Sequence, residues 1–274
     1  MLTVFAPRNR ELLVHLTMRE LRSKYKRTLL GWGWSMLNPL LMALIYSAVF
    51  GSFFHLSAPK GNPSGIDNFT FFLLAALLPW AFVVNAIGMG IGSIVGNAGL
   101  IQKVAFRRES LVVAAVVSNA VSLAIELTVY SAFLLAVTHR NAFFYLPIAF
   151  IIIVIQTIFL LGLAMMLAAA NVYFRDVQYL TTVALTAWMY LTPVVYSITT
   201  VPLKGHVFGK LLPVRYIIRL NPMSRFIGAF RESLYDLRFP SLITWLSMVG
   251  SAAVTLALGG IVFQRLQSRF AEEL

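Results

Sequence analysis

The sequence predicts an all-helical integral membrane protein with six transmembrane helices. Hydrophobic residues make up 59% of its 274 residues and charged residues only 12%, which is too apolar for a soluble domain of this size. Six apolar stretches are each long enough to cross a bilayer, which takes about 20 helical residues. Because the backbone must satisfy its own hydrogen bonds inside lipid, each stretch is expected to be a helix.

The spans and their connections account for nearly the whole chain. We expect the spans at roughly 34–54, 69–95, 111–137, 143–170, 179–196 and 242–263. Lys and Arg are concentrated before the first span, after the second span and in the tail, which predicts that both termini are cytoplasmic. The basic loop before the sixth span is then outside, where long loops are less bound by the charge rule. Residues 1–33 would form an N-terminal segment and residues 34–274 a single transmembrane domain.

The N-terminal segment is predicted to form an amphipathic helix. Apolar residues recur at i, i+4, i+7 and i+11: Val14, Met18, Leu21 and Tyr25. Basic residues occupy a different face: Arg19, Arg22 and Lys26. This pattern is typical of a helix that lies in the cytoplasmic interface of a membrane, either as a simple anchor or as part of a gate.

A bend and a new helix start are predicted before the first span. Gly31 and Gly33 permit the bend because glycine tolerates unusual backbone angles. Asn38 is a favoured N-cap and Pro39 suits the first helical turn, so the first membrane helix is expected to begin there.

A short amphipathic helix is predicted at about 97–109, between the second and third spans. Leu100, Ile101 and Val104 share one face, and Lys103, Arg107 and Arg108 lie around it. The candidate docking residues are these six together with Phe106. A cytoplasmic helix of this kind could dock on a soluble partner. The alternative is a solvated, charged turn.

The outer segment at about 197–240 is expected to hold short re-entrant or gate helices between the fifth and sixth spans. It contains a second Asn-Pro pair, Asn221-Pro222. An apolar helical stripe follows this pair: Met223, Phe226, Ile227, Phe230 and Leu234. A polar face is expected opposite the stripe: Arg225, Arg231 and Glu232. Non-helical breaks at membrane depth are tolerated only against protein or a water-filled cavity, so this segment points to a conduit.

The sequence contains no catalytic or nucleotide-binding motif. It lacks a G-x-x-x-x-G-K-[ST] phosphate loop, it has no cysteine, and its four histidines show no metal-ligand spacing. We therefore expect no catalytic residue, metal or cofactor in this chain. The net charge of +12 is attributed to anionic lipid headgroups and membrane orientation, not to nucleic acid.

Glu126 and several aromatic residues are candidates for the wall of a polar passage. Glu126 lies within the third span, where an ionised side chain costs on the order of 3 kcal/mol. It either faces the passage or is protonated and paired, for example with Gln156. The aromatic candidates are Tyr46, Phe50, Phe53, Trp188 and Tyr190. Aromatic faces can stack on sugar rings, and the alternative for these residues is an interfacial belt with ordinary helix packing.

Four stretches of the chain form a recognisable series. They are residues 16–40, which end in Asn38-Pro39-Leu40, then 100–109, then 171–196, which begin Asn171-Val-Tyr-Phe-Arg-Asp-Val-Gln178, and 220–231. With these stretches the chain resembles the membrane subunit of type-2 ABC exporters of lipid-linked polysaccharides, which include O-antigen, teichoic acid, capsule and galactan exporters. Arg107 departs from the pattern, since the family often has proline after the residue equivalent to Phe106.

The resemblance implies an ABC-2 type exporter fold in the bacterial inner membrane. Two copies of the chain would form a homodimer that binds two copies of a separate ATPase subunit. ATP and Mg²⁺ would be held by that subunit, so this chain would be a permease and not an enzyme. The segment at 97–109 would couple to the ATPase, and the first and fifth spans would line the conduit. The outer gate would include Asn221, Pro222, Phe226 and Phe230.

The exported glycan would be carried on a polyprenyl diphosphate, an anionic headgroup that needs basic residues at the cytoplasmic leaflet. The candidates are Lys24, Lys26, Arg27 and Arg175. Two other functions remain open at this point: a type-2 permease for a drug or small lipid, and a membrane enzyme of lipid-linked sugars. A third, an ion-driven secondary carrier, would normally show more acidic residues inside the membrane.

Overall fold

The described part of the chain is mostly helical, as predicted. The computed structural model describes residues 7–24, 31, 33–46, 48–49, 58–103, 106–207 and 210–273. The elements in chain order are α1 (Pro7–Lys24), α2 (Gly33–Tyr46), α3 (Phe69–Gly92), α4 (Ala98–Lys103), α5 (Glu109–Thr138), α6 (Leu146–Tyr173), α7 (Val177–Leu191), β1 (Gly205–Val207), β2 (Lys210–Leu212), α8 (Val214–Leu220), α9 (Pro222–Leu234), α10 (Leu242–Leu266) and α11 (Phe270–Glu273). The two strands pair as a small antiparallel hairpin.

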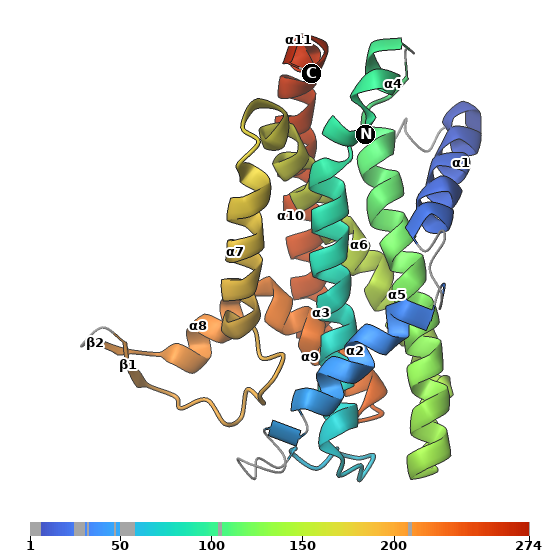
Figure 1. Cartoon of the computed structure of the whole chain (residues 1–274). Helices are drawn as coiled ribbons and strands as arrows, with labels where there is room; N and C mark the ends of the chain where they lie inside the picture. Colours follow the sequence, from blue (N-terminus) through green and yellow to red (C-terminus); the bar gives the residue numbers. More distant parts are fainter. Residues whose placement is uncertain are drawn as a thin grey trace.

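Four helices form the central bundle and run side by side: α3, α5, α6 and α10 (Figure 1). Among the described residues, four segments are long and apolar enough to cross a membrane: Phe69–Gly92, Glu109–Thr138, Phe143–Tyr173 and Leu242–Arg269. They coincide with the predicted second, third, fourth and sixth spans. The core is centred on α3, in which every residue from Phe71 to Trp80 is buried.

The predicted fifth span is shorter than expected. α7 has 15 residues, so it covers about 22 Å, against about 30 Å for the hydrocarbon core. It ends at Leu191 because the next residue, Thr192, precedes Pro193, and a residue before proline disfavours the helical conformation. Thr192 is indeed extended, with φ −109° and ψ 136°. The prediction of helix over 192–196 is therefore wrong, and the count of six spans is not confirmed at α7.

The first predicted span is described as helix only over α2, which has 14 residues; residues 50–57 lie outside the described residues. α2 begins at Gly33, so the predicted helix start at Asn38 is wrong. The bend falls at Gly31, whose φ of +52° suits glycine. The amide of Trp34 donates to the Gly31 carbonyl at 3.3 Å. Because the turn is already complete at Gly31, the helix can start five residues earlier than the Asn-Pro pair suggested.

α1 packs along α5, as Figure 1 shows at the upper part of α5. The residues of α1 that are buried are Leu13, Leu16 and Leu21. Val14 and Met18 of the predicted stripe are 53% and 42% exposed, whereas Leu21 is buried. α1 divides its apolar residues between a face against the bundle and a face turned away from it, where lipid would cover them.

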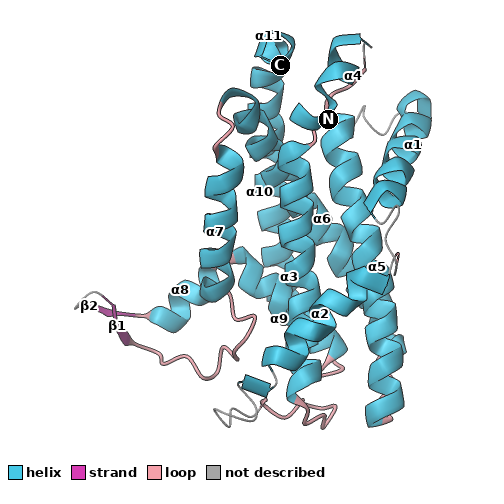
Figure 2. Ribbon diagram, in the orientation of Figure 1, coloured by secondary structure: helices cyan, strands magenta, loops and turns pink. Residues whose placement is uncertain are grey.

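The two ends of the bundle carry different elements (Figures 1 and 2). α4, α11 and the turn between α6 and α7 lie at one end, which we call the inner end after the predicted topology. α8 and the β1–β2 hairpin project sideways from the opposite, outer end. The predicted cytoplasmic loop and the C-terminus therefore share one end, and the basic segment before α10 lies at the other.

α6 and α10 come into backbone contact at two glycines. A Cβ atom added at Gly259 would lie 2.1 Å from the carbonyl oxygen of Gly162. A Cβ added at Gly162 would lie 2.3 Å from the carbonyl group of Thr255. Small residues at such crossings let membrane helices approach closely and gain packing contacts.

Candidate transport pathway

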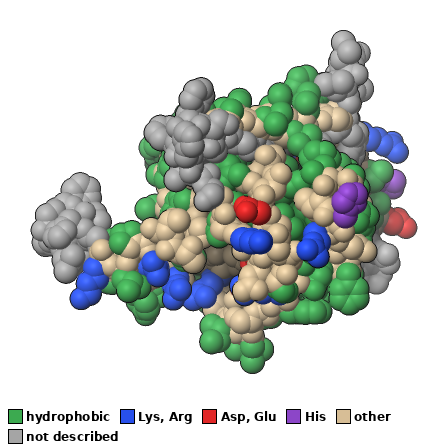
Figure 3. All heavy atoms as spheres, turned by 90° about the horizontal axis from the view of Figure 1, so that it is seen from below, with side chains coloured by type: hydrophobic (Ala, Val, Ile, Leu, Met, Phe, Trp, Pro, Cys, Tyr) green, Lys and Arg blue, Asp and Glu red, His purple; other side chains and the backbone are tan. Residues whose placement is uncertain are grey.

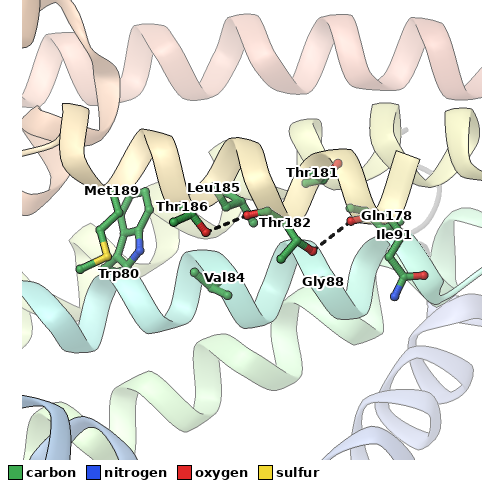
Figure 4. Close-up of a pocket in the computed structure, with 10 residues that line it drawn as sticks. All are labelled: Trp80, Val84, Gly88, Ile91, Gln178, Thr181, Thr182, Leu185, Thr186 and Met189. Carbon is green, nitrogen blue, oxygen red and sulfur yellow. Dashed lines mark hydrogen bonds between the residues drawn. The ribbon is translucent and has the colours of Figure 1, made fainter. Parts of the chain in front are cut away.

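A groove of about 240 Å³ lies between α3 and α7. Its lining residues, shown in Figure 4, are Trp80, Val84, Gly88, Ile91, Gln178, Thr181, Thr182, Leu185, Thr186 and Met189. The α3 wall is mostly apolar, and a Cβ added at Gly88 would meet no atom of the described chain within 4 Å. The α7 wall carries hydroxyl and amide groups, so the groove has one apolar and one polar side.

The polar side of the groove is a stripe along α7. Gln178, Thr182 and Thr186 recur at i, i+4 and i+8, which places them on one helix face. The Thr182 hydroxyl donates to the Gln178 carbonyl and the Thr186 hydroxyl to the Thr182 carbonyl, both at 3.0 Å. Because these hydrogens are used within the helix, the hydroxyl oxygens remain as acceptors for donors in the groove. A ligand rich in hydroxyl groups fits this wall.

Asn221 ties the outer end of α7 to the start of α9. Its Oδ1 accepts from the indole Nε1 of Trp188 and from the amide of Met223, each at 3.0 Å. Its Nδ2 donates to the Thr192 hydroxyl at 2.9 Å and to the Leu191 carbonyl at 3.2 Å. The predicted gate residue Asn221 is thus both an N-cap of α9 and a crosslink to α7.

We expect Asn221→Ala to destabilise the protein more than Asn68→Ala. Both residues cap a helix, and the side-chain oxygen of Asn68 accepts from the amides of Thr70 and Phe71 within its own helix. Loss of a cap costs about 1 kcal/mol, and Asn221 loses three bonds to α7 in addition, each worth about 1 kcal/mol. Thermal unfolding of the two variants in the same detergent measures the difference; equal destabilisation would contradict the crosslink.

Arg231 is buried between α9, α3 and the chain that follows α7. The side chain is 9% exposed, and its Nη atoms donate to the carbonyls of Pro193 and Val194 at 2.5 Å and of Tyr196 at 3.1 Å. The guanidinium carbon lies 3.8 Å from the centre of the Phe72 ring, a cation–π contact. Burial lowers the pKa of Arg231 to about 9, so the group is still a cation at neutral pH. The prediction that Arg231 lies on an exposed polar face is wrong.

The predicted conduit and gate aromatics lie in different surroundings. Phe226 and Phe230 are fully buried in the core, and Trp188 packs edge-on against Trp80 with ring centres 6.1 Å apart. Tyr190 is 68% exposed. Phe50 and Phe53 lie outside the described residues, as does the side chain of Tyr46. Among the described aromatic candidates, Trp188 lies next to the groove through its contact with Trp80.

Lys24 connects α1 to a polar face of α5. Its Nζ lies 2.6 Å from Asn119 Oδ1 and 3.3 Å from the Ser122 hydroxyl, and Glu126 acts on it electrostatically. Asn119, Ser122 and Glu126 are all buried and follow one another along α5. Lys24 therefore fixes the end of α1 instead of standing free at the surface. The amide of Gln156, which the sequence offers as a possible partner of Glu126, donates to the Pro79 carbonyl at 3.4 Å.

The predicted coupling helix is shorter than 97–109. α4 ends at Lys103, residues 104–105, which include Val104, lie outside the described residues, and α5 begins at Glu109. Ile101 is buried and Leu100 and Phe106 pack partly against the core. Lys103 and Arg107 are exposed. Arg108 instead turns to the C-terminal segment, where it donates to the Gln267 carbonyl and lies 5.9 Å from the Phe270 ring centre.

Of the other residues predicted to bind the lipid headgroup, the structure describes one. Arg175 is exposed in the turn between α6 and α7 at the inner end. Lys26 and Arg27 lie outside the described residues. The sequence reading missed the polar stripe of α7, although the spacing of Gln178, Thr182 and Thr186 is visible in the sequence.

Sequence comparisons relate the chain to known transport proteins. A family model described as "ABC-2 type transporter" matches residues 11–235. The chain is 29% identical to the O-antigen export system permease protein RfbA of Myxococcus xanthus, over 97% of this chain and 96% of that protein. It is 28% identical to an RfbA protein of Klebsiella pneumoniae, over 96% and 95%. A shorter match, 31% identical over 85 residues and 31% of each chain, is to the polysialic acid transport protein KpsM of Escherichia coli.

Proposed function

Because the chain belongs to the ABC-2 type transporter family, we propose that it is the membrane subunit of an ATP-driven exporter of a polyprenyl-diphosphate-linked polysaccharide. The observation that carries this proposal is the α3–α7 groove, whose hydroxyl-lined wall suits a polymer of sugars. The names of the relatives, which export O-antigen or transport polysialic acid, support the same class of cargo.

The transporter would be a homodimer in the bacterial inner membrane. The outward side of α7 exposes Tyr179, Leu180 and Val183 by 64–77%, an apolar surface that a second copy could cover beside the groove. Each copy would bind one ATPase subunit at the inner end, and that subunit would hold ATP and Mg²⁺, since this sequence contains no phosphate loop.

The lipid-linked end of the polymer would enter at the inner end. Arg175 is exposed at the mouth of α7 and would attract the diphosphate, together with Lys26 and Arg27. Lys24 would act differently from these residues, by holding α1 on α5 through Asn119. The exposed Lys103 and Arg107 would contact the ATPase.

Export can be tested by removing the chain and restoring it. Deletion of the chain should abolish surface polysaccharide and leave polymer inside the cell, and expression of the chain should restore export. Loss of a small lipid or drug efflux with normal surface polysaccharide would reject the proposal in favour of a small-cargo permease.

Lys103→Asp should uncouple the two subunits. Reversal of an exposed charge at a docking surface repels a complementary partner, so we expect export to fall about tenfold or more. Lys204→Asp makes the same change on an exposed residue at the outer end and should leave export unchanged. The readouts are the amount of surface polysaccharide and the amount of ATPase that copurifies with the chain. Normal values of both in the Lys103→Asp variant would show that Lys103 does not contribute to the docking surface.

A further inference from the structure

A second cavity lies at the outer end, apart from the α3–α7 groove. It measures about 290 Å³ and is bounded by the loop before α3, the loop after α7 and one face of α9. Figure 3 looks at this end and shows acidic and basic side chains next to one another near its middle. The volume is far above the roughly 10–15 Å³ that one water needs and close to the lower limit of small-molecule sites, about 300 Å³.

Two oxygen atoms on the α9 wall of this cavity are buried without a hydrogen-bond partner in the described chain: Ser224 Oγ and Glu232 Oε2. Ser224 is only 7% exposed. The other carboxylate oxygen of Glu232 accepts from Arg238 at 2.7 Å. Buried polar atoms are nearly always paired, so these two oxygens are the groups of this wall that still need a hydrogen-bond donor.

Gly228 opens the same wall. It lies between Ser224 and Glu232 along α9, one turn from each, and a Cβ added there would meet no atom of the described chain within 4 Å. Glycine weakens a helix interior, and no close helix contact in this part of the chain requires it here. A side chain at position 228 would project into the cavity and fill it.

The charges around the cavity favour a neutral ligand. An anion would meet the carboxylates of Glu232 and Asp236, and a cation would meet Lys60, Arg231 and Arg238. Burial raises the pKa of both carboxyl groups, as expected where water is partly excluded. A sugar ring satisfies both sets, because each hydroxyl group can donate to a carboxylate or to Ser224 and accept from Lys60 or Arg238. Tyr235 adds an aromatic ring to the lining.

We propose that this cavity, the outer sugar pocket, binds one neutral sugar unit of the exported polymer as it leaves the membrane. Ser224 and Glu232 accept hydrogen bonds from the sugar, and Gly228 leaves the space for its ring. The inference rests on the proposed function for the identity of the polymer, while the binding step can be measured without transport.

The test uses the full chain, purified from membranes with its bound subunits and placed in lipid nanodiscs. Saturation-transfer NMR is recorded with the methyl glycosides of glucose, galactose, mannose and N-acetylglucosamine at millimolar concentrations. At least one glycoside should give a signal with the unmodified chain. Gly228→Leu should lower its affinity about tenfold or more, and Gly250→Leu, at a glycine of α10 with equally open surroundings, should leave it unchanged.

Ser224→Ala separates binding from folding. The variant removes a buried hydroxyl that has no partner in the described chain, so its melting temperature should stay the same or rise. Glycoside affinity should fall about tenfold, as for the loss of one good hydrogen bond. No signal from any glycoside with the unmodified chain, or signals in the Gly228→Leu and Ser224→Ala variants equal to those of the unmodified chain, would overturn the proposal.

A measurement of surface polysaccharide in cells distinguishes failure of the outer sugar pocket from failure of the proposed function. If the unmodified chain restores export but binds no glycoside, the outer sugar pocket is rejected and the proposed function stands. If deletion of the chain leaves surface polysaccharide intact, the proposed function is rejected, and the pocket is then judged by the NMR result alone.

Discussion

Gly259→Ala should destabilise the protein by about 3 kcal/mol, although it adds one methyl group. The new Cβ would lie 2.1 Å from the Gly162 carbonyl oxygen and 2.8 Å from its Cα. These atoms belong to backbone, so α6 and α10 would have to separate, and the whole interface between the two helices would lose contacts. Gly162→Ala should have a similar effect, since its Cβ would lie 2.3 Å from Thr255 backbone atoms.

Gly250→Ala is the matched control for this prediction. Gly250 lies on the same helix as Gly259, and a Cβ there would meet nothing within 4 Å in the described structure. Alanine should be neutral or stabilising at this site, because it favours a helix more than glycine does. Thermal unfolding in one detergent compares the three variants. If Gly259→Ala is as stable as Gly250→Ala, the close approach of α6 and α10 is wrong.

Arg231→Leu should cost about 3–5 kcal/mol and disrupt the outer end of the molecule. The substitution removes the donors to the carbonyls of Pro193, Val194 and Tyr196 and the cation over the Phe72 ring. The Pro193 and Val194 carbonyls would remain buried without these donors, and the half-buried Tyr196 carbonyl would lose its donor as well. The chain after α7 would lose its attachment to α9. Export should fall with stability, because α7 forms one wall of the groove.

Two further variants serve as comparisons for Arg231→Leu: Arg231→Lys, which keeps the charge, and Arg219→Met, which removes an exposed arginine. Lysine keeps the charge but cannot reproduce the planar fork of donors, so it should recover only part of the stability. Arg219 is exposed at the end of α8, and its loss should change stability by less than about 0.5 kcal/mol. Protease resistance of the 192–213 segment and the melting temperature are the readouts. A stable, export-competent Arg231→Leu variant would show that the bonds from Arg231 to the chain after α7 are not needed for stability or export.

Much of the bundle follows from the sequence because lipid imposes a simple rule. A helix that crosses the bilayer needs a long apolar stretch, and the predicted second, third, fourth and sixth spans match segments of that length in the structure. The end of α7 could also have been found, since Pro193 is visible in the sequence and disfavours helix at Thr192.

The position of Arg231 could not be inferred from local periodicity. α9 does bury Phe226 and Phe230, as the apolar stripe predicted. A stripe model assumes that the opposite face meets water, but here part of that face is covered by the carbonyls of Pro193 to Tyr196, which come from a distant segment of the chain. The contact between Gly162 and Gly259 has the same origin, because two helices far apart in sequence must first be placed side by side.

One wall of the candidate groove could be predicted from the sequence and the other could not. The polar spacing of Gln178, Thr182 and Thr186 is a local signal, whereas the facing wall of Val84, Gly88 and Ile91 is supplied by the tertiary packing of α3. The surroundings of the aromatic conduit candidates also depend on tertiary packing: Trp188 contacts Trp80, whereas Tyr190 is 68% exposed.

The central claim is that the polymer passes along the α3–α7 groove, and site-specific crosslinking during export tests it most directly. A diazirine-bearing residue is introduced at Thr182, in the groove, or at Val254, which is 58% exposed on α10 away from it. In cells with an active ATPase, irradiation should attach polysaccharide at position 182 but not at 254, and an ATPase unable to hydrolyse ATP should reduce the adduct. Equal adducts at both positions, or lipid alone at position 182, would contradict the account.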